Sequence, residues 1–283
     1  MCAATWEEAA VLGGFLPRSS FEPFVEEARK KLTAPQLADI WKSHREAVSF
    51  VRGLTVEDLA NVGESPLAKQ FSFREEEIRN QEEFREIYEG RTVRFATVRP
   101  TRLAVFQFQV RIGGRPLSAE PSLVLDECLP KTFNVEVDLE LLGNPSTHSF
   151  QVTATTDTGN VFLGKPRLDH EKQLFELPFL PNRNWVQVAH FAKRYWIHNG
   201  YHRIYNLIAL GVDRIPCIVY EAEVPVEVVG NVIDLQSFEK LRQMKRPPLM
   251  MDFFSKTAIK LPRRRHRRML VVTLQVGSEQ VPV

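Results

Sequence analysis

Residues 195–207 read YWIHNGYHRIYNL, and this stretch decides the local fold near the centre of the chain. An apolar strand breaks at Asn199 and Gly200, and a helix begins at once with His202 and Arg203 in its first turn. The first N–H groups of a helix lack partners within it, and its dipole is positive at that end, so both attract anions. The junction therefore predicts a site for phosphate.

Composition narrows the class of protein. The 283 residues are 43% hydrophobic and 25% charged, which is typical of a soluble globular chain. A net charge of +2 gives no strong overall attraction to nucleic acid. Cys2, Cys128 and Cys217 are scattered and form no CxxC pair, so neither a zinc ribbon nor a disulfide framework is indicated.

The lack of a recognisable signal peptide or membrane segment in the sequence predicts a cytoplasmic location. The first residues include Glu7 and Glu8 and lack the basic start and apolar run of a signal peptide. No stretch reaches the roughly 18 uncharged apolar residues that a membrane helix requires. We therefore expect a cytoplasmic protein with no membrane partner.

The first 90 residues have helical patterns. Apolar spacings of three and four predict helices at 21–32 and 34–51. Thr33 and Gln36 fit a capping box at the start of the second helix. A shorter helix is expected at 56–61, and a highly charged helix with one narrow buried stripe at 73–88.

After Gly90 the pattern changes to strands. Alternating apolar and polar residues predict an antiparallel or barrel-like layer, with strands at 93–98, 103–112, 133–142, 149–155, 161–163 and 174–177. From Trp185 onward the pattern mixes both types. It predicts a hairpin of 186–190 and 193–197, a helix at 201–210, a strand at 215–220, a helix at 234–244 capped by Asp234, and a last strand at 269–276.

We therefore expect an α+β protein with four regions. These are a helical region at 1–90, a β-rich region at 91–180, a mixed-sheet core at 181–245 and a basic C-terminal tail at 246–283.

Residues 185–220 resemble a known nucleotide-binding core. The residues that carry the resemblance are Gly200-Tyr201-His202-Arg203, then Gly211 after the helix, then Ile215-Pro216 at the start of the last strand. This order is similar to that of the ParB/sulfiredoxin-like superfamily, which includes chromosome-partition ParB proteins, sulfiredoxins and free-serine kinases. The likeness covers about an eighth of the chain.

The resemblance implies roles for the turn. Members bind CTP, ATP or ADP with the turn and helix start against the phosphates. By this resemblance Asn199 and Gly200 line the site, and Gly200 allows close backbone approach. Tyr201 and His202 would donate N–H groups, Arg203 would pair with phosphate oxygens, and His202 would be the catalytic residue for proton transfer. A nucleotide accompanied by Mg²⁺ is the cofactor that follows, with no protein ligand for the metal.

Three departures remove particular activities. Tyr201 stands near the place of the sulfiredoxin cysteine, which argues against sulfinic-acid reduction. Asn199 replaces the acidic residue that precedes the glycine in the serine kinases, and an amide cannot act as a carboxylate base. Ile204 stands where partition proteins have a second arginine, and the last 60 residues show no helix-turn-helix pattern. Whether the chain is an enzyme stays open.

A basic cluster near the C-terminus offers a second candidate site. Five arginines could track a nucleic-acid backbone, although a short basic run is also common on a solvated loop: Arg263, Arg264, Arg265, Arg267 and Arg268. Asp169, His170 and Glu171 have ligand-type side chains but no matching second cluster, so no metal site is predicted.

Three hypotheses about function remain. The first is a nucleotide- or phosphate-binding protein, either an NTP-dependent hydrolase or a phosphotransferase. The second is a non-enzymatic interaction subunit with a degenerate pocket, bound to a protein partner or to a second copy of itself. The third is a nucleic-acid-binding or nucleic-acid-cleaving protein that uses the arginine cluster.

Overall fold

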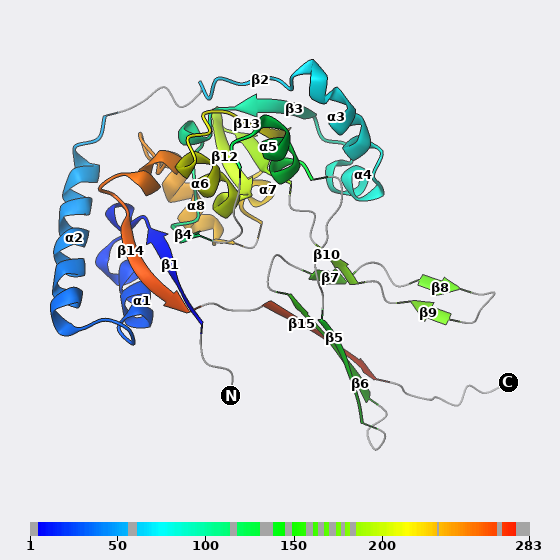
Figure 1. Cartoon of the computed structure of the whole chain (residues 1–283), viewed down its shortest axis with the longest axis horizontal. Helices are drawn as coiled ribbons and strands as arrows, with labels where there is room; N and C mark the ends of the chain where they lie inside the picture. The colour runs from blue at the N-terminus through cyan, green and yellow to red at the C-terminus, as the bar shows by residue number, and fades with distance from the viewer. Residues whose placement is uncertain are drawn as a thin grey trace. The chain divides into compact units, whose positions relative to one another are not determined.

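The computed structural model describes residues 5–55, 61–113, 118–130, 138–144, 149–156, 161–163, 167–169, 174–176, 179–181, 185–230, 232–264 and 268–275. Helices and mixed sheets confirm the α+β class (Figure 1). The chain divides into two compact units. Unit 1 contains residues 1–131 and 185–265, and unit 2 contains residues 132–184 and 266–283. None of the helices within the described ranges is long and apolar enough to cross a membrane.

A five-stranded sheet forms the centre of unit 1. Its strands lie in the order β12 (Arg194–Asn199), β11 (Gln187–Phe191), β13 (Ile215–Glu221), β3 (Val93–Val98) and β2 (Ser65–Pro66). Only β11 and β13 pair in parallel, and the other neighbours are antiparallel. The predicted hairpin of β11 and β12 is confirmed, and so is the strand predicted at 215–220, which corresponds to β13. Because β3 pairs with β13, the expected boundary after residue 90 falls inside unit 1.

Helices complete the core around this sheet. They are α5 (Pro121–Cys128) and α6 (Tyr201–Ala209), which contact each other, together with α7 (Pro225–Val229) and α8 (Leu235–Gln243). The first six residues of β13 are buried, which indicates that both faces of this central strand are covered. The Trp196 ring meets the edge of Phe238 from α8 at 4.9 Å between centroids. The predicted helix at 234–244 is confirmed, with Asp234 Oδ1 accepting the Ser237 N–H at 2.8 Å.

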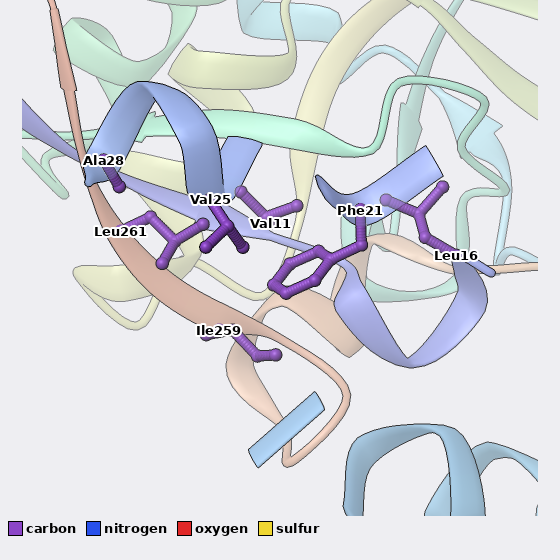
Figure 2. Close-up of a cluster of buried hydrophobic side chains, with 7 residues drawn as sticks. All are labelled: Val11, Leu16, Phe21, Val25, Ala28, Ile259 and Leu261. Atoms are coloured by element: carbon purple, nitrogen blue, oxygen red, sulfur yellow. The ribbon is translucent and has the colours of Figure 1, made fainter. Parts of the chain in front are cut away.

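A smaller sheet lies in the same unit. Its strands lie in the order β14 (Ile259–Arg264), β1 (Trp6–Val11) and β4 (Gln109–Ile112). Helix α1 (Arg18–Ala28) packs on β14, and α2 (Ala34–Arg52) follows. Figure 2 shows the apolar side chains that meet between them: Val11, Leu16, Phe21, Val25, Ala28, Ile259 and Leu261. The helical pattern predicted for residues 1–90 does not extend to β1, which lies between two strands from distant parts of the chain.

Helix α2 begins at the predicted residue, whereas the charged segment that follows it forms two helices. The capping box is confirmed in its Gln36 half, since Oε1 accepts the Thr33 N–H at 2.8 Å. The single helix predicted at 73–88 was wrong, because α3 (Ser72–Arg79) ends at Asn80 and α4 (Glu82–Tyr88) begins afresh. Asparagine favours helix ends over interiors, which accounts for the division. Residues 56–60 of the other predicted helix lie outside the described part of the chain.

The strand predicted at 103–112 is correct only at its end. Residues 103–106 are buried but do not form a ladder with one neighbour. The Ala104 N–H donates to Tyr195 O at 2.8 Å, whereas the Val105 N–H donates to Pro248 O at 3.0 Å. The apolar run at 103–106 thus reflects burial of this segment on all sides rather than a regular strand.

Unit 2 is built from β-strands in the residues that the structure describes. Three antiparallel strands lie in the order β15 (Arg268–Gln275), β6 (Ser149–Thr156) and β5 (Asp138–Asn144). Two further antiparallel pairs are β7 (Val161–Leu163) with β10 (Phe179–Pro181), and β8 (Arg167–Asp169) with β9 (Leu174–Glu176). The predicted strands at 149–155, 161–163, 174–177 and 269–276 are therefore confirmed to within two residues. The first five residues of the strand predicted at 133–142 fall outside the described ranges.

Candidate functional site

The junction between β12 and α6 has the backbone conformation that its glycine predicts. Gly200 takes φ = 103° in the left-handed region, where residues with a Cβ are strained. A Cβ added at Gly200 would also lie 3.0 Å from Val186 Cγ2. Glycine at this position therefore allows both the turn and the close packing against the segment before β11. No side chain caps the start of α6 by hydrogen bonding.

Tyr201 is directed into the protein core. Its side chain is 3% exposed, and its hydroxyl oxygen accepts the Phe106 N–H at 3.1 Å. The ring also meets the edge of Phe106, with 5.8 Å between centroids. Burial raises the pKa of Tyr201 above its ordinary value, while the backbone hydrogen bonds act in the opposite direction. The side chain thus anchors α6, and only its backbone remains for the role that the resemblance implies.

His202 also makes a contact that fixes the helix. Its Nδ1 accepts the Arg111 N–H at 2.9 Å, which joins α6 to β4. An imidazole nitrogen that accepts a hydrogen bond carries no proton. The predicted catalytic histidine therefore has Nδ1 committed to the backbone of a neighbouring strand.

Arg203 and Asn199 lie on either side of these anchors. Arg203 is half-buried, and its charge acts on the thiol of Cys128 at the end of α5. Burial raises the pKa of Cys128 to about 12, and the Arg203 charge opposes this rise. Asn199 ends β12 opposite Gln187 of β11. Strand β12 therefore places Asn199 at the junction, and helix α6 places Arg203 there.

His198 faces a cavity that the sequence did not reveal. The cavity has a volume of about 220 Å³ and is lined by Ile87, Tyr88, Arg91, Gln187, His198, Tyr220 and Glu227. His198 Nδ1 lies 2.7 Å from Val228 O, so this nitrogen carries the proton and donates. Burial lowers the pKa of His198, partly offset by that bond. The imidazole is therefore held in its neutral form.

A polar network crosses the five-stranded sheet. Arg94 binds the carboxylates of both Glu64 and Glu221, with 2.5 Å between Nη1 and Glu221 Oε1. His190 Nδ1 lies 2.6 Å from Glu221 Oε2, and the Tyr195 hydroxyl donates to Glu64 Oε2 at 2.7 Å. Burial raises the pKa of both carboxyl groups, but their hydrogen bonds outweigh it and hold each pKa below its ordinary value. Each member comes from a different segment, so no local motif could have identified the network.

The arginine cluster is only partly described. Arg263 lies opposite Glu7 in the pairing of β14 with β1, and the Arg264 N–H donates to Glu27 Oε1 at 3.1 Å. Arg268 begins β15 of the other unit. Arg265 and Arg267, and likewise His170 and Glu171, lie outside the described residues. Over the described ranges, no three His, Cys, Asp or Glu residues come together as metal ligands.

Comparisons with protein-family models, curated proteins and solved structures return no match for this chain. A relation to the ParB/sulfiredoxin-like superfamily therefore stays a prediction from the sequence of residues 185–220.

Proposed function

We propose that the chain binds a phosphate-bearing ligand, most simply a nucleoside di- or triphosphate, at the start of α6. The observation that carries this proposal is the left-handed Gly200 turn, which leads directly into a helix without a side-chain cap. Such a turn leaves the first backbone N–H groups of the helix directed outward at the positive end of its dipole. This arrangement suits an anion.

Arg203 supplies the positive charge for this site. It lies in the first turn of α6, and a guanidinium carries five N–H donors. It can therefore keep a contact within the protein while it donates to phosphate oxygens. Tyr201 and His202 support the site indirectly, because their hydrogen bonds to Phe106 and Arg111 fix the orientation of the helix.

A divalent metal would depend mainly on the nucleotide. Mg²⁺ retains several water ligands and is commonly bound through substrate phosphates and only one or two carboxylates. The junction residues 199–203 offer no carboxylate, so the phosphates and water would supply the metal ligands. Hydrolysis or phosphoryl transfer would require a base, and the engaged Nδ1 of His202 does not supply one.

The proposal includes a cytoplasmic location, where nucleotides are abundant. Cys128 and Cys217 are free thiols within the core, which suits a reducing compartment. Cell fractionation with an antibody to the chain would test this, and recovery in an oxidising compartment would contradict it.

Calorimetric titration with ATP, CTP and ADP, with and without Mg²⁺, tests the proposal. We expect at least one nucleotide to bind, and Arg203→Gln to weaken its binding by about tenfold or more, because hydrogen bonds to charged groups contribute about 1.5–3 kcal/mol. Arg45→Gln is the matched control, since Arg45 lies exposed on α2. Unchanged circular dichroism would show that both variants are folded.

The same experiments would show whether one of the two other hypotheses should replace the phosphate site. If no nucleotide binds, or if Arg203→Gln binds as tightly as the wild type, the phosphate site is refuted. Co-purification of a stable protein partner in that case would favour the interaction subunit. Salt-sensitive DNA or RNA binding that disappears when the five arginines are neutralised would favour the nucleic-acid hypothesis.

A further inference from the structure

The cavity that His198 lines shares no residue with the proposed phosphate site at 199–203. Its walls come from α4, from the strands β11, β12 and β13, and from α7. Its volume of about 220 Å³ corresponds to about seven liquid-water volumes of ~30 Å³ each. Sites for drug-sized ligands are larger, at about 300–1,000 Å³. The cavity therefore suits one ring or a compact fused pair of rings.

Charge within the cavity is already balanced. Arg91 Nη2 lies 3.0 Å from Glu227 Oε1, and its guanidinium also lies over the Tyr220 ring at 5.6 Å. An anion would be drawn to Arg91 but repelled by the Glu227 carboxylate in the same wall. A cation would meet the opposite conflict. The electrostatics consequently favour a ligand without net charge.

Tyr88 provides a hydroxyl group whose bonding is incomplete. The residue is 6% exposed, and its hydroxyl oxygen has no hydrogen-bond partner in the described part of the chain. Burial raises the pKa of Tyr88 well above its ordinary value, while the Arg91 charge and, more weakly, the nearby Gln187 amide, which does not meet hydrogen-bond geometry with the hydroxyl, act in the opposite direction. The group therefore stays protonated and able to donate. A buried polar group without a partner costs about 1–3 kcal/mol, which a ligand acceptor would recover.

His198 provides the complementary acceptor. Because Nδ1 donates to Val228 O, the neutral ring has its lone pair on Nε2. The cavity thus combines a tyrosine donor, a histidine acceptor and the Gln187 amide, which can do either. Aromatic rings of Tyr88 and Tyr220 form the apolar part of the wall, with 5.7 Å between their centroids.

We propose that this cavity binds a neutral nitrogen heterocycle with an adjacent N–H and C=O, that is, a lactam of nucleobase size. Its C=O accepts from the Tyr88 hydroxyl, and its N–H donates to His198 Nε2. A planar ring can lie against the face of one of the two tyrosine rings, which are tilted by 53° to each other, and neutrality matches the Arg91–Glu227 pair. The proposal is independent of the phosphate site, because no cavity residue belongs to the turn or to α6.

Titration of the full chain followed by NMR tests this inference. The probes are uracil and hypoxanthine as neutral lactams, benzoate as an anion and benzamidine as a cation. We expect at least one lactam to bind with Kd of about 1 mM or tighter, and the charged probes to bind at least about tenfold more weakly. Tyr88→Phe should weaken lactam binding roughly tenfold, because one hydrogen bond is lost while the ring remains.

Two further variants make the test specific. His198→Asn keeps a donor for Val228 O but removes the Nε2 acceptor, so it should weaken lactam binding to a similar degree. Tyr205→Phe, on α6, is the matched control and should bind as the wild type does. Arg203→Gln should also leave lactam binding unchanged, which separates this inference from the phosphate site. The inference is overturned if neither lactam binds, if benzoate binds more tightly than both, or if folded Tyr88→Phe retains wild-type affinity.

Discussion

The start of α6 and the cavity beside α4 use tyrosine in opposite ways. At α6 the hydroxyl of Tyr201 accepts a backbone N–H at 3.1 Å and fixes the helix in the core. In the cavity the hydroxyl of Tyr88 has no hydrogen-bond partner among the described residues, although this side chain is also buried. The first tyrosine therefore contributes to architecture, whereas the second is available to a ligand. A tyrosine within a sequence motif, such as Tyr201, can therefore be purely structural, while one outside any motif, such as Tyr88, can be available to bind a ligand.

Truncation of Tyr201 should have the greatest effect on stability. We expect Tyr201→Ala to lower the free energy of unfolding of unit 1 by about 4 kcal/mol, because a buried aromatic ring and its hydrogen bond are both lost. Leu210→Ala is the control, since Leu210 is 47% exposed at the end of the same helix. Urea unfolding followed by tryptophan fluorescence would measure both. Equal losses would contradict the anchoring role.

The Gly200 turn should be next in effect. Gly200→Ala should cost about 2 kcal/mol, because the left-handed backbone is strained by a Cβ and Val186 leaves it little room. Gly211→Ala should cost only about 1 kcal/mol, because φ is also positive there but no atom lies within 4 Å of the added Cβ. The difference between the two unfolding free energies isolates the contact with Val186. If Gly211→Ala were the more damaging, this account of the turn would be wrong.

Removal of a single hydroxyl compares the two tyrosines directly. Tyr201→Phe should cost about 1–2 kcal/mol, since the Phe106 N–H loses its acceptor. Tyr88→Phe should leave stability unchanged or raise it by up to about 1 kcal/mol, because an unpaired hydroxyl is removed. Urea unfolding of both variants gives the two values side by side. A loss of more than about 1 kcal/mol for Tyr88→Phe would show that its hydroxyl has a partner.

The network around Arg94 should make a smaller, pH-dependent contribution. The pKa values of Glu64 and Glu221 are lower in the folded state, despite burial, because Arg94 binds both carboxylates. The folded state therefore binds fewer protons, and this stabilisation is present above the unfolded pKa of about 4.3 and is lost as pH falls through the folded values.

The stability difference between the wild type and Arg94→Gln should consequently be larger at neutral pH than in acid. These side chains are partly exposed, so solvent screening limits the effect. Urea unfolding across this pH range measures it, with Arg45→Gln as a control that should show no such trend. A difference that grows in acid would contradict the assignment.

Local signals in the sequence explain which parts of the fold were predictable. Gly200, the Thr33–Gln36 box and the Asp234 cap each act within a few residues, so the turn and two helix starts could be predicted. Strand β1 could not, because its neighbours β4 and β14 lie about one hundred and two hundred and fifty residues away. The apolar residues of a short strand that comes just before a helix carry no separate signal.

The candidate sites divide in the same way. The phosphate site is contained in five consecutive residues, 199–203, and its backbone conformation follows from one glycine. The cavity combines residues from 87 to 227, and its character depends on which hydroxyl is left without a partner. The engagement of Tyr201 and His202 was equally invisible, because Phe106 and Arg111 are about ninety residues away.

Amide hydrogen exchange with saturating nucleotide tests the central claim most directly. The ligand is proposed to bind the first N–H groups of α6, so exchange at residues 201–203 should slow when the nucleotide that binds most tightly is added. Exchange around the cavity, at residues 87–91, should not change, and Arg203→Gln should reduce the protection at the same nucleotide concentration. Protection that appears only elsewhere in the chain, or unchanged exchange at 201–203 when nucleotide is bound, would contradict a phosphate site at this junction.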